Sequence, residues 1–232
     1  MKLIALLIAG SCLNQLNFER FFGQDYAMAK TEMAAVSKQI DLVSQQYLVD
    51  DDIVKAIVFP ELIRNSVFSG MIEEKTLALS YIELGSDKID FSIGKFQIKP
   101  SFALAVETLV NENPYLKKTY TKLPIMAKDQ KFQRAQRIQR LNDVTWQATY
   151  VCAFIDYCEY KYSLKDLSVP EKIKFLATAY NAGLKSNKHE VEASYDLRAF
   201  PYGKKYRIQQ VNYWEVSVDY FIKNRNEHKI GK

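Results

Sequence analysis

The sequence predicts a mainly α-helical fold built as a single domain. Glycine and proline are sparse, with 8 and 6 residues in a chain of 232, whereas a chain of many short strands needs frequent turn residues. Apolar residues recur at helical spacing in several long segments. The hydrophobic fraction of 48% and the charged fraction of 25% are those of an ordinary globular protein and exclude a wholly disordered chain. A chain of this length can bury one sizeable core but is short for two full domains.

Helical spacing and breaking residues give the expected order of elements. The acidic residues Asp50–Asp52 favour a helix start, because carboxylates suit the positive end of a helix, and this helix carries an apolar stripe and delivers Glu61 near its end. Pro60 removes a backbone donor, so the helix should kink there or end soon after it. The segment Phe91–Pro100 is expected to form a turn that leads into a short helix. The other expected helices are Met33–Val49, Met71–Leu84, Gln136–Tyr160, a helix opened by the capping box Ser168–Glu171 and stopped at Gly183, and a final helix within Tyr202–Lys223.

The N-terminal residues 1–23 are typical of an export signal. A lysine precedes a short apolar stretch, Leu3–Ala9, and the following Ala-Gly-Ser-Cys resembles the site at which a bacterial lipoprotein is cut and acylated, which would place a lipid anchor at Cys12. An alternative cleavage site lies before Gln24. Polar residues interrupt the apolar run, so no transmembrane helix is expected. The sequence therefore predicts an exported protein of the bacterial periplasm or cell envelope, with residues 24–232 as its folded domain.

The charge pattern does not favour a nucleic-acid partner. The net charge of +5 is modest, and basic residues alternate with acidic ones. A nucleic-acid-binding protein is expected to cluster lysine and arginine on one element, and the best candidate is Lys128–Arg140. We interpret that segment as a solvated helix face opposite Ile138 and Leu141. Mild basicity also suits a polyanionic cell-wall polymer.

Neither the cysteines nor the histidines predict a metal site. Cys152 and Cys158 are six residues apart on one predicted helix, so they lie on different faces and are expected to be two buried thiols rather than a disulfide or a metal pair. The two histidines, His189 and His228, show no zinc-ligand spacing. No metal or cofactor is expected.

Three separated segments carry the candidate functional residues. The first, Ile53–Glu61, resembles the helix that ends in the catalytic glutamate of soluble lytic transglycosylases and goose-type lysozymes, including an Ala-Ile pair before the acid. The second, Gly94–Ala103, is similar to the Gly-Leu-Met-Gln-Ile-x-Pro-x-x-Ala segment of the same family. The third, Ala179–Gly183, is identical to its Ala-Tyr-Asn-Ala-Gly motif. The three segments follow the family's order and span Ile53 to Gly183.

This resemblance implies a lysozyme-like fold and an enzyme that cleaves the glycan strands of peptidoglycan without a cofactor. It implies that Glu61 is the catalytic acid, that Gln97, Tyr180 and Asn181 bind the substrate, and that the tyrosine hydrogen-bonds the catalytic carboxyl. The residue types suit these roles. Glycine lets the backbone approach a glycan closely, and a glutamine amide can both donate to and accept from sugar groups. A carboxyl buried among apolar groups has the raised pKa that a proton donor needs.

Two departures from the family pattern leave a second candidate for the acid. Leu62 stands where the family usually has serine, and the link from Glu61 to Gln97 is longer than usual. A helix inserted at Met71–Leu84 would account for the extra length. The insertion also places Glu83 nearer in sequence to Gln97, so Glu83 is the alternative acid. We prefer Glu61, because the helix before it matches the family.

Three functions are compatible with these residues. A lytic transglycosylase needs one carboxyl, which protonates the bond between N-acetylmuramic acid and N-acetylglucosamine and then takes a proton from the muramoyl C6 hydroxyl. A hydrolytic muramidase needs a second carboxylate, for which Asp87 and Asp90 are the candidates, although both are expected to form turns or cap a helix. A wall-binding or assembly protein would keep the groove without turnover, as Pro60 and Leu62 suggest. The catalytic hypothesis predicts that Glu61 is partly buried in one groove with the other two motifs, within hydrogen-bond reach of their tyrosine.

Overall fold

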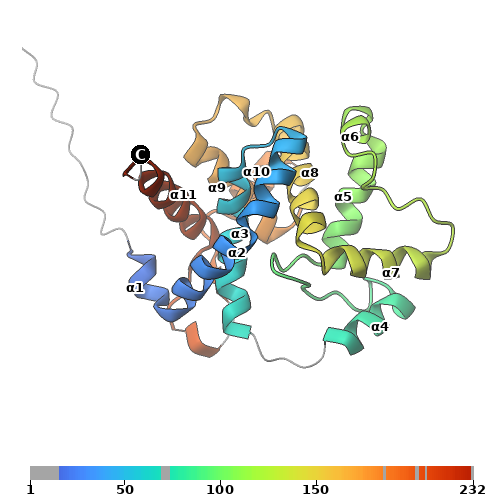
Figure 1. Cartoon of the computed structure of the whole chain (residues 1–232), viewed down its shortest axis with the longest axis horizontal. Coiled ribbons are helices and arrows are strands. Elements are labelled where there is room, and N and C mark those ends of the chain that lie inside the picture. The colour runs from blue at the N-terminus through green and yellow to red at the C-terminus, as the bar shows by residue number, and fades with distance from the viewer. Residues whose placement is uncertain (1–15, 69–73, 185–186, 202–203, 207, 231–232) are drawn as a thin grey trace, which may run out of the picture.

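Helices dominate the part of the chain that the structure describes, which confirms the predicted mainly α fold (Figure 1). The computed structural model describes residues 16–68, 74–184, 187–201, 204–206 and 208–230. About 72% of these described residues are helical and 4% are in strands. The elements are α1 (Phe18–Phe22), α2 (Gln24–Tyr47), α3 (Asp51–Phe68), α4 (Glu74–Leu84), α5 (Pro100–Glu112), α6 (Pro114–Thr119), α7 (Gln130–Leu141), α8 (Val144–Tyr162), the short 3₁₀ helix η1 (Leu164–Asp166), α9 (Val169–Ala182), α10 (Lys188–Glu192), β1 (Arg198–Phe200), the 3₁₀ helix η2 (Lys204–Tyr206), β2 (Val211–Asn212) and α11 (Tyr213–Ile230).

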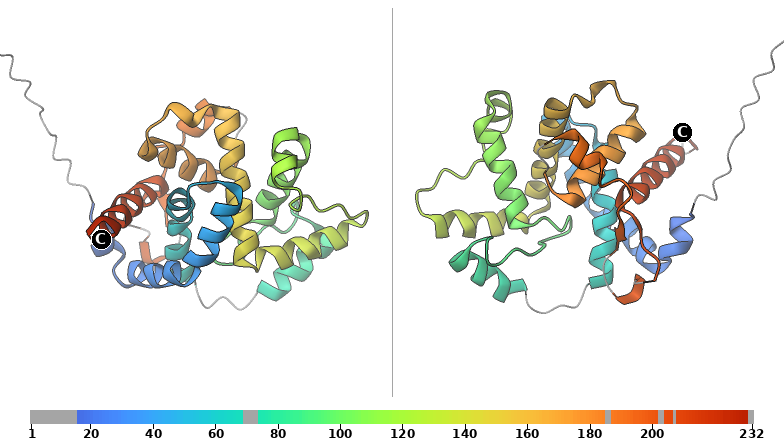
Figure 2. Two further views of the ribbon diagram at one scale, coloured as in Figure 1. Left: turned by 45° about the horizontal axis from the view of Figure 1, so that its top comes forward. Right: turned by 180° about the vertical axis from the view of Figure 1, so that it is seen from behind.

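The longer helices form two groups. Helices α2, α3, α8, α9 and α11 pack against one another, whereas α4, α5, α6 and α7 gather at the opposite end of the molecule, at the right of Figure 1. The view from behind in Figure 2 shows the same division. Helices α5, α6 and α7 all contact α8, which therefore joins the two groups. The antiparallel strands β1 and β2 lead into α11.

Helix α3 is the buried centre of the first group. Every residue from Ile53 to Ile63 is buried, and the helix contacts α2, α8, α9 and α11. A helix that is apolar around most of its circumference is stable only inside a core, which explains this position. Lys55 is buried as well, and its ammonium pairs with Asp41 and Asp51 at 2.6 Å each. Glu61 is thus carried on a helix that is enclosed by other helices.

Pro60 does not end α3, which continues to Phe68. A proline inside a helix removes one intrahelical hydrogen bond and crowds the carbonyl four residues earlier, which here belongs to Ala56. The next carbonyl, that of Ile57, accepts a hydrogen bond of 2.8 Å from the Tyr213 hydroxyl. A donor from α11 therefore supports α3 beside the proline. The predicted placement of the acid near the end of its helix is wrong, because the helix runs on past it.

The helix predicted over Gln136–Tyr160 is two helices. Helix α7 ends at Leu141, and the backbone amide of its C-cap residue Asn142 bonds back to carbonyls of the last turn. Helix α8 begins at Val144, and the side chain of its N-cap residue Asp143 accepts a hydrogen bond of 3.0 Å from the Trp146 amide. Asparagine and aspartate are favourable at helix ends because their side chains satisfy exposed backbone groups. This local capping outweighs the apolar periodicity that continues across the break.

The other predicted helices are present with different ends. Helix α2 begins at Gln24 rather than at Met33, and the short helix expected after the Phe91–Pro100 turn is the 13-residue α5. Helix α4 is described from Glu74, and the first residues of the predicted inserted helix lie outside the described residues. Helix α11 begins only at Tyr213, because the chain before it is used by the two strands and η2.

The basic segment Lys128–Arg140 is the solvated helix face that the sequence predicts only in part: Lys128 and Lys131 are exposed, but the three arginines have partners within the protein. Arg134 donates to two carbonyls at the end of α4, each at 3.1 Å. Arg140 donates to two carbonyls in the loop after α6 and lies 4.0 Å from the centre of the Trp146 ring. Arg137 is only 2% exposed. The three arginines therefore satisfy carbonyl groups and a buried carboxylate within the protein.

A buried ion pair holds the second group of helices to α8. Arg137 donates to the two oxygens of Glu107 at 3.0 and 2.6 Å, and to the Tyr81 hydroxyl at 2.8 Å. The Tyr150 hydroxyl donates to Glu107 at 2.5 Å. These four side chains come from α7, α5, α4 and α8 respectively. Removing one partner of such a pair leaves an uncompensated charge in a medium of low dielectric, which is strongly destabilising.

We expect Glu107→Gln to lower the free energy of unfolding by about 3–5 kcal/mol, because it leaves the buried guanidinium of Arg137 without its counter-charge. Urea unfolding followed by circular dichroism measures the loss. Glu83→Gln is the matched control: it breaks the pair between Glu83 and Lys131, whose side chains are 59% and 56% exposed, and should cost less than about 1 kcal/mol. Equal losses in the two variants would contradict a structural role for the buried pair.

The predicted leader is only partly described. Residues 1–15, which include Cys12, lie outside the described residues. Phe18 and Phe22 belong to α1 and are buried, and Phe22 packs edge-on against Tyr206 and Phe200 at ring distances of 5.5 and 6.0 Å. Cleavage before Gln24 would remove these buried rings. Among the described residues, no helix has both the length and the apolar character needed to cross a membrane.

The two described cysteines are buried thiols, as the sequence predicts. Cys152 and Cys158 are both free, and both lie on α8. Burial raises the pKa of the Cys158 thiol well above its usual range, and that of Cys152 to about 12. Because the thiolate is the reactive form of cysteine, both side chains act as small apolar groups of the core.

Candidate functional site

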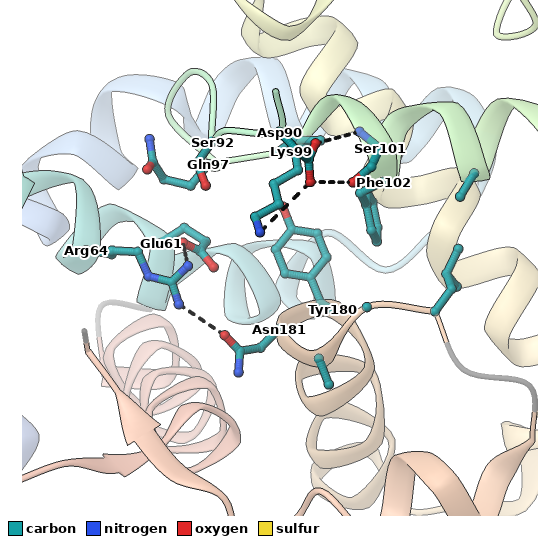
Figure 3. A pocket seen from close by; sticks show the side chains of 15 residues that line it. Glu61, Arg64, Asp90, Ser92, Gln97, Lys99, Ser101, Phe102, Tyr180 and Asn181 are labelled. Carbon is teal, nitrogen blue, oxygen red and sulfur yellow. Dashed lines mark hydrogen bonds and ion pairs between the residues drawn. The ribbon is translucent and has the colours of Figure 1, made fainter. Parts of the chain in front are cut away.

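A pocket of about 350 Å³ opens where α3, α5 and α9 meet the loop before α5. Figure 3 shows this pocket and the side chains around it. Its polar lining residues are Glu61, Arg64, Asp90, Ser92, Gln97, Lys99, Ser101, Tyr180 and Asn181. Because α3 and α9 belong to the first group of helices and α5 to the second, the pocket lies between the two groups.

All four predicted site residues line this pocket. Glu61 comes from α3, Gln97 from the turn before α5, and Tyr180 and Asn181 from the end of α9. The alternative acid, Glu83, does not line it. Its exposed side chain lies on α4 and pairs with a lysine of α7. The structure thus brings the three sequence motifs together around Glu61.

The turn that carries Gln97 is narrow and closed by backbone bonds. Ile93 and Ile98 pair in antiparallel fashion, with N–H to O distances of 3.0 and 3.1 Å. Gly94 and Gln97 both have positive φ, at 69° and 51°, a region that glycine adopts without steric cost and other residues rarely adopt. The side-chain nitrogen of Gln97 donates to the Gly94 carbonyl at 2.8 Å. The side-chain oxygen of Gln97 can therefore accept from a ligand.

A buried glutamine of α8 anchors the same turn, and sequence reasoning missed it. Gln147 accepts a hydrogen bond of 2.7 Å from the Phe96 amide and donates to the Leu141 carbonyl at 2.6 Å. Its side chain occupies the space beside Gly94, where an added Cβ would lie only 1.9 Å from the Gln147 amide nitrogen. Gly94 is therefore required both by its backbone angle and by the close approach of α8.

Helix α9 presents Tyr180 and Asn181 as the sequence predicts, but the tyrosine has another partner. The capping box is formed, with Ser168 and Glu171 bonded to each other, and the helix stops at Gly183. The Tyr180 hydroxyl donates to the Phe96 carbonyl at 2.9 Å. The expected hydrogen bond from this tyrosine to the acid is thus replaced by a bond that holds the Gln97 turn against α9.

The carboxyl of Glu61 is almost completely buried, although the sequence predicted partial burial. The residue is 2% exposed. Arg64, one turn later on α3, places Nη1 3.1 Å from Oε2, yet no described group makes a well-aligned hydrogen bond to that oxygen. The contact is therefore mainly one of charge. Burial raises the pKa of the Glu61 carboxyl, and the opposing effects of the positive charges of Arg64 and Lys99 are smaller.

Tyr213, at the start of α11, is a second residue that sequence reasoning missed. Its hydroxyl donates to the Ile57 carbonyl at 2.8 Å and also hydrogen-bonds the carboxyl of Glu61. Donation to the carboxylate would lower the pKa of Glu61. However, a hydroxyl has one proton and a carbonyl can only accept, so a tyrosine that donates to Ile57 can only accept from the acid. In that arrangement the contact favours protonated Glu61.

Arg64 links the acid to the motif on α9. Its Nη2 donates to the Asn181 side-chain oxygen at 3.0 Å, and its guanidinium lies 5.4 Å from the centre of the Phe200 ring. The amide nitrogen of Asn181 is left to donate to a ligand. The sequence marks Arg64 only by its spacing of three residues from Glu61, which is too common on helices to single it out.

A second carboxylate and a second cation stand on the opposite wall of the pocket (Figure 3). Both oxygens of Asp90 accept from Ser101, from its amide at 3.0 Å and from its hydroxyl at 2.7 Å. Asp90 thereby stabilises the first turn of α5, as its expected capping role requires. The Lys99 ammonium lies 4.0 Å from Asp90. Its positive charge also lowers the pKa of Glu61. Asp87, the other predicted candidate, does not line the pocket.

These groups suit acid–base chemistry on a polar ligand. The pocket combines one deeply buried carboxyl with amides that can hold hydroxyl or acetamide groups, and cations border it on both walls. No cluster of three or more potential metal-ligating side chains occurs among the described residues. No family model, curated protein or solved structure matches this chain. The function must therefore be inferred from the residues and their geometry.

We expect Gly94→Ala to lower the free energy of unfolding by about 2–4 kcal/mol, since it adds overpacking to backbone strain. The new Cβ would meet a backbone oxygen, that of Leu141, at 2.4 Å as well as the Gln147 amide. Gly23→Ala is the control, because Gly23 also has positive φ, at 53°, but has no atom within 4 Å of an added Cβ. Urea unfolding should show the larger loss for Gly94→Ala, and an equal or smaller loss would contradict the close packing of α8 against this turn.

Proposed function

We propose that this protein is a lytic transglycosylase with a lysozyme-like fold that cleaves the β-1,4 bond between N-acetylmuramic acid and N-acetylglucosamine in peptidoglycan. The observation that carries the proposal is the convergence of three sequence motifs, far apart in the chain, on one pocket around a buried carboxyl. Each motif resembles the corresponding segment of that family. The substrate lies outside the cytoplasmic membrane, which agrees with the leader-like N-terminal residues.

Glu61 is the proposed proton donor and acceptor. In its neutral form it protonates the glycosidic oxygen, so that the bond from C1 of the muramoyl residue to this oxygen breaks. The C6 hydroxyl of the same residue then closes onto C1 and returns its proton to the carboxylate. The product is a 1,6-anhydro-muramoyl end, no water is consumed, and the carboxyl regains its initial state.

The neutral form of this acid is supported by two features of its surroundings. Burial disfavours the anion and raises the pKa of Glu61. The Tyr213 hydroxyl, whose proton is directed to the Ile57 carbonyl at 2.8 Å, accepts best from a protonated carboxyl. Both features favour the protonated form, from which Glu61 can donate.

Gln97 and Asn181 are the proposed sugar-binding residues. The side-chain oxygen of Gln97 can accept from a hydroxyl or an acetamide N–H, and the side-chain nitrogen of Asn181 can donate to an acetamide carbonyl. Tyr180 acts by position, because its bond of 2.9 Å to the Phe96 carbonyl fixes the Gln97 turn. Ligand contact and turn geometry are thus divided between neighbouring residues of α9.

Hydrolysis is the second candidate function, and the presence of Asp90 in the same pocket favours it. A hydrolase would use this carboxylate to activate water across the scissile bond. Both Asp90 oxygens already accept from Ser101, which makes a single-carboxyl reaction the better-supported proposal. Mass spectrometry of digested sacculi separates the two, since transglycosylation gives anhydro-muramoyl ends and hydrolysis gives reducing ends.

We expect Glu61→Gln to reduce the release of soluble fragments from purified sacculi by roughly 10²- to 10⁴-fold, because glutamine cannot donate the proton. The variant should remain folded, since an amide replaces a carboxyl of the same size. Glu83→Gln, which removes the alternative acid, should retain activity. Unchanged cleavage by Glu61→Gln would refute the assignment of Glu61 as the acid, whereas a wild type that releases no fragments would support a binding or assembly role for the pocket.

The alkaline limb of the pH–activity profile should move to higher pH in the Lys99→Met variant. A proton donor loses activity as the pH rises through its pKa, and the positive charge of Lys99 lowers the pKa of Glu61. Removing that charge leaves the acid protonated to higher pH. Initial rates on sacculi at constant ionic strength measure the limb. Lys131→Met, which changes a lysine paired with Glu83 away from the pocket, should leave the limb where it is.

A further inference from the structure

Glu61 and Arg64 form a charge pair, although the proposed reaction requires Glu61 to be neutral. The pair is close, with Nη1 3.1 Å from Oε2, and both side chains are mostly buried, at 3% and 15% exposure. A cation at this distance stabilises the ionised carboxylate, whereas a proton donor must be neutral. Protonation of Glu61 therefore removes the negative charge that faces Arg64 across 3.1 Å.

Among the described residues that line the pocket, no other negative charge lies in that place. Asp90 on the opposite wall accepts two hydrogen bonds from Ser101 and lies 4.0 Å from Lys99. The other titratable groups beside the acid, Tyr180 and Tyr213, are phenols whose pKa values burial raises well above the usual range, so they stay neutral. When Glu61 is neutral, the described lining of the pocket thus holds two cations and one carboxylate, and this balance favours an anionic ligand.

A buried oxygen also marks where a ligand group can bind. Oε2 of Glu61 makes no well-aligned hydrogen bond with a described group, although the residue is 2% exposed and lines the pocket. Buried polar atoms are normally satisfied by protein, water or a ligand. Arg64 presents its guanidinium at the same place, held there by the bond of 3.0 Å to Asn181. A guanidinium is well suited to bind a carboxylate.

We infer that the pocket selects a glycan that bears a carboxylate, which binds Arg64 in the place of the ionised Glu61 and thereby favours the protonated acid. The inference rests on the proposed function, because it takes Glu61 to be the proton donor. Ligand carboxylate and proton are coupled: each binds more tightly when the other is bound. The substrate's own charge then sets the acid in its reactive form, and an uncharged glycan of the same length does not.

Two disaccharides test this coupling without turnover. N-acetylglucosaminyl-N-acetylmuramic acid with a free lactyl carboxylate lacks the bond that the proposed reaction cleaves, and chitobiose differs from it by the absence of the lactyl group. Dissociation constants are measured by calorimetry from pH 5 to pH 8, where the ligand carboxylate stays ionised. We expect the wild type to bind the acidic disaccharide roughly 10-fold or more tightly than chitobiose at pH 5. This preference should decline as the pH rises through the pKa of Glu61.

Two variants assign the effect to the charge pair. Glu61→Gln carries a permanently neutral side chain, so its preference for the acidic disaccharide should be as large as that of the wild type at pH 5 and should not change with pH. Arg64→Gln should bind the two disaccharides equally well, and Arg64→Lys, which keeps a positive charge, should restore part of the preference. Thermal melts show that each variant is folded.

Three outcomes would overturn the inference. These are equal affinity of the wild type for the two disaccharides, a preference that does not vary with pH in the wild type, and failure of Glu61→Gln to bind the acidic disaccharide. None of these measurements involves cleavage. A protein that cleaves sacculi but binds both disaccharides alike refutes the inference alone, whereas pH-coupled binding without cleavage refutes the proposed enzymatic function alone.

Discussion

The burial of α3 is the constraint on which the rest of the structure depends. Its residues from Ile53 to Ile63 are all buried, so the helix must be enclosed by others, and each polar group on it must find a partner inside the protein. Lys55 meets two aspartates, and the carbonyl near Pro60 meets a tyrosine hydroxyl. Glu61 meets Arg64 on one side and an open pocket on the other. The chemistry of the acid is a consequence of this enclosure, because the same burial that stabilises the core disfavours the charged carboxylate.

Buried polar side chains, and not apolar packing alone, join the two groups of helices on either side of the pocket. Gln147 fixes the turn that carries Gln97, and Tyr180 holds the same turn from α9. Farther from the pocket, Arg137 and Glu107 connect the second group to α8. Such bonds have defined directions and lengths, whereas apolar contacts tolerate sliding. A directional attachment keeps the wall that carries Gln97 and Lys99 at a fixed distance from the wall that carries the acid.

The sequence predicted the parts of the site that have a local signature. The capping box and Gly183 define α9 from within a few residues, and the apolar stripe before Glu61 predicts the helix that carries this residue. Arg64, Gln147 and Tyr213 could not be predicted, because a lone arginine, glutamine or tyrosine has no local pattern and its role depends on which residues the fold places beside it. The same reason explains the errors. The bond from Tyr180 to a carbonyl and the inward direction of Arg137 depend on tertiary partners, and the break at Asn142–Asp143 depends on capping that apolar periodicity conceals.

A residue that both gives and takes a proton needs surroundings that do not favour one form too strongly. Burial and the Tyr213 hydroxyl favour the neutral acid, while Arg64 and Lys99 favour the carboxylate that remains after proton donation. Because these influences come from different elements, each can change without disturbing the others. Of the four, Arg64 is the one whose charge a bound anion can compensate most directly, because its guanidinium lies in the pocket beside the acid. The fraction of Glu61 that is protonated therefore depends partly on the protein and partly on the ligand. In a pocket with a single acid, binding of an anionic ligand thus favours the protonated form that the proposed reaction needs.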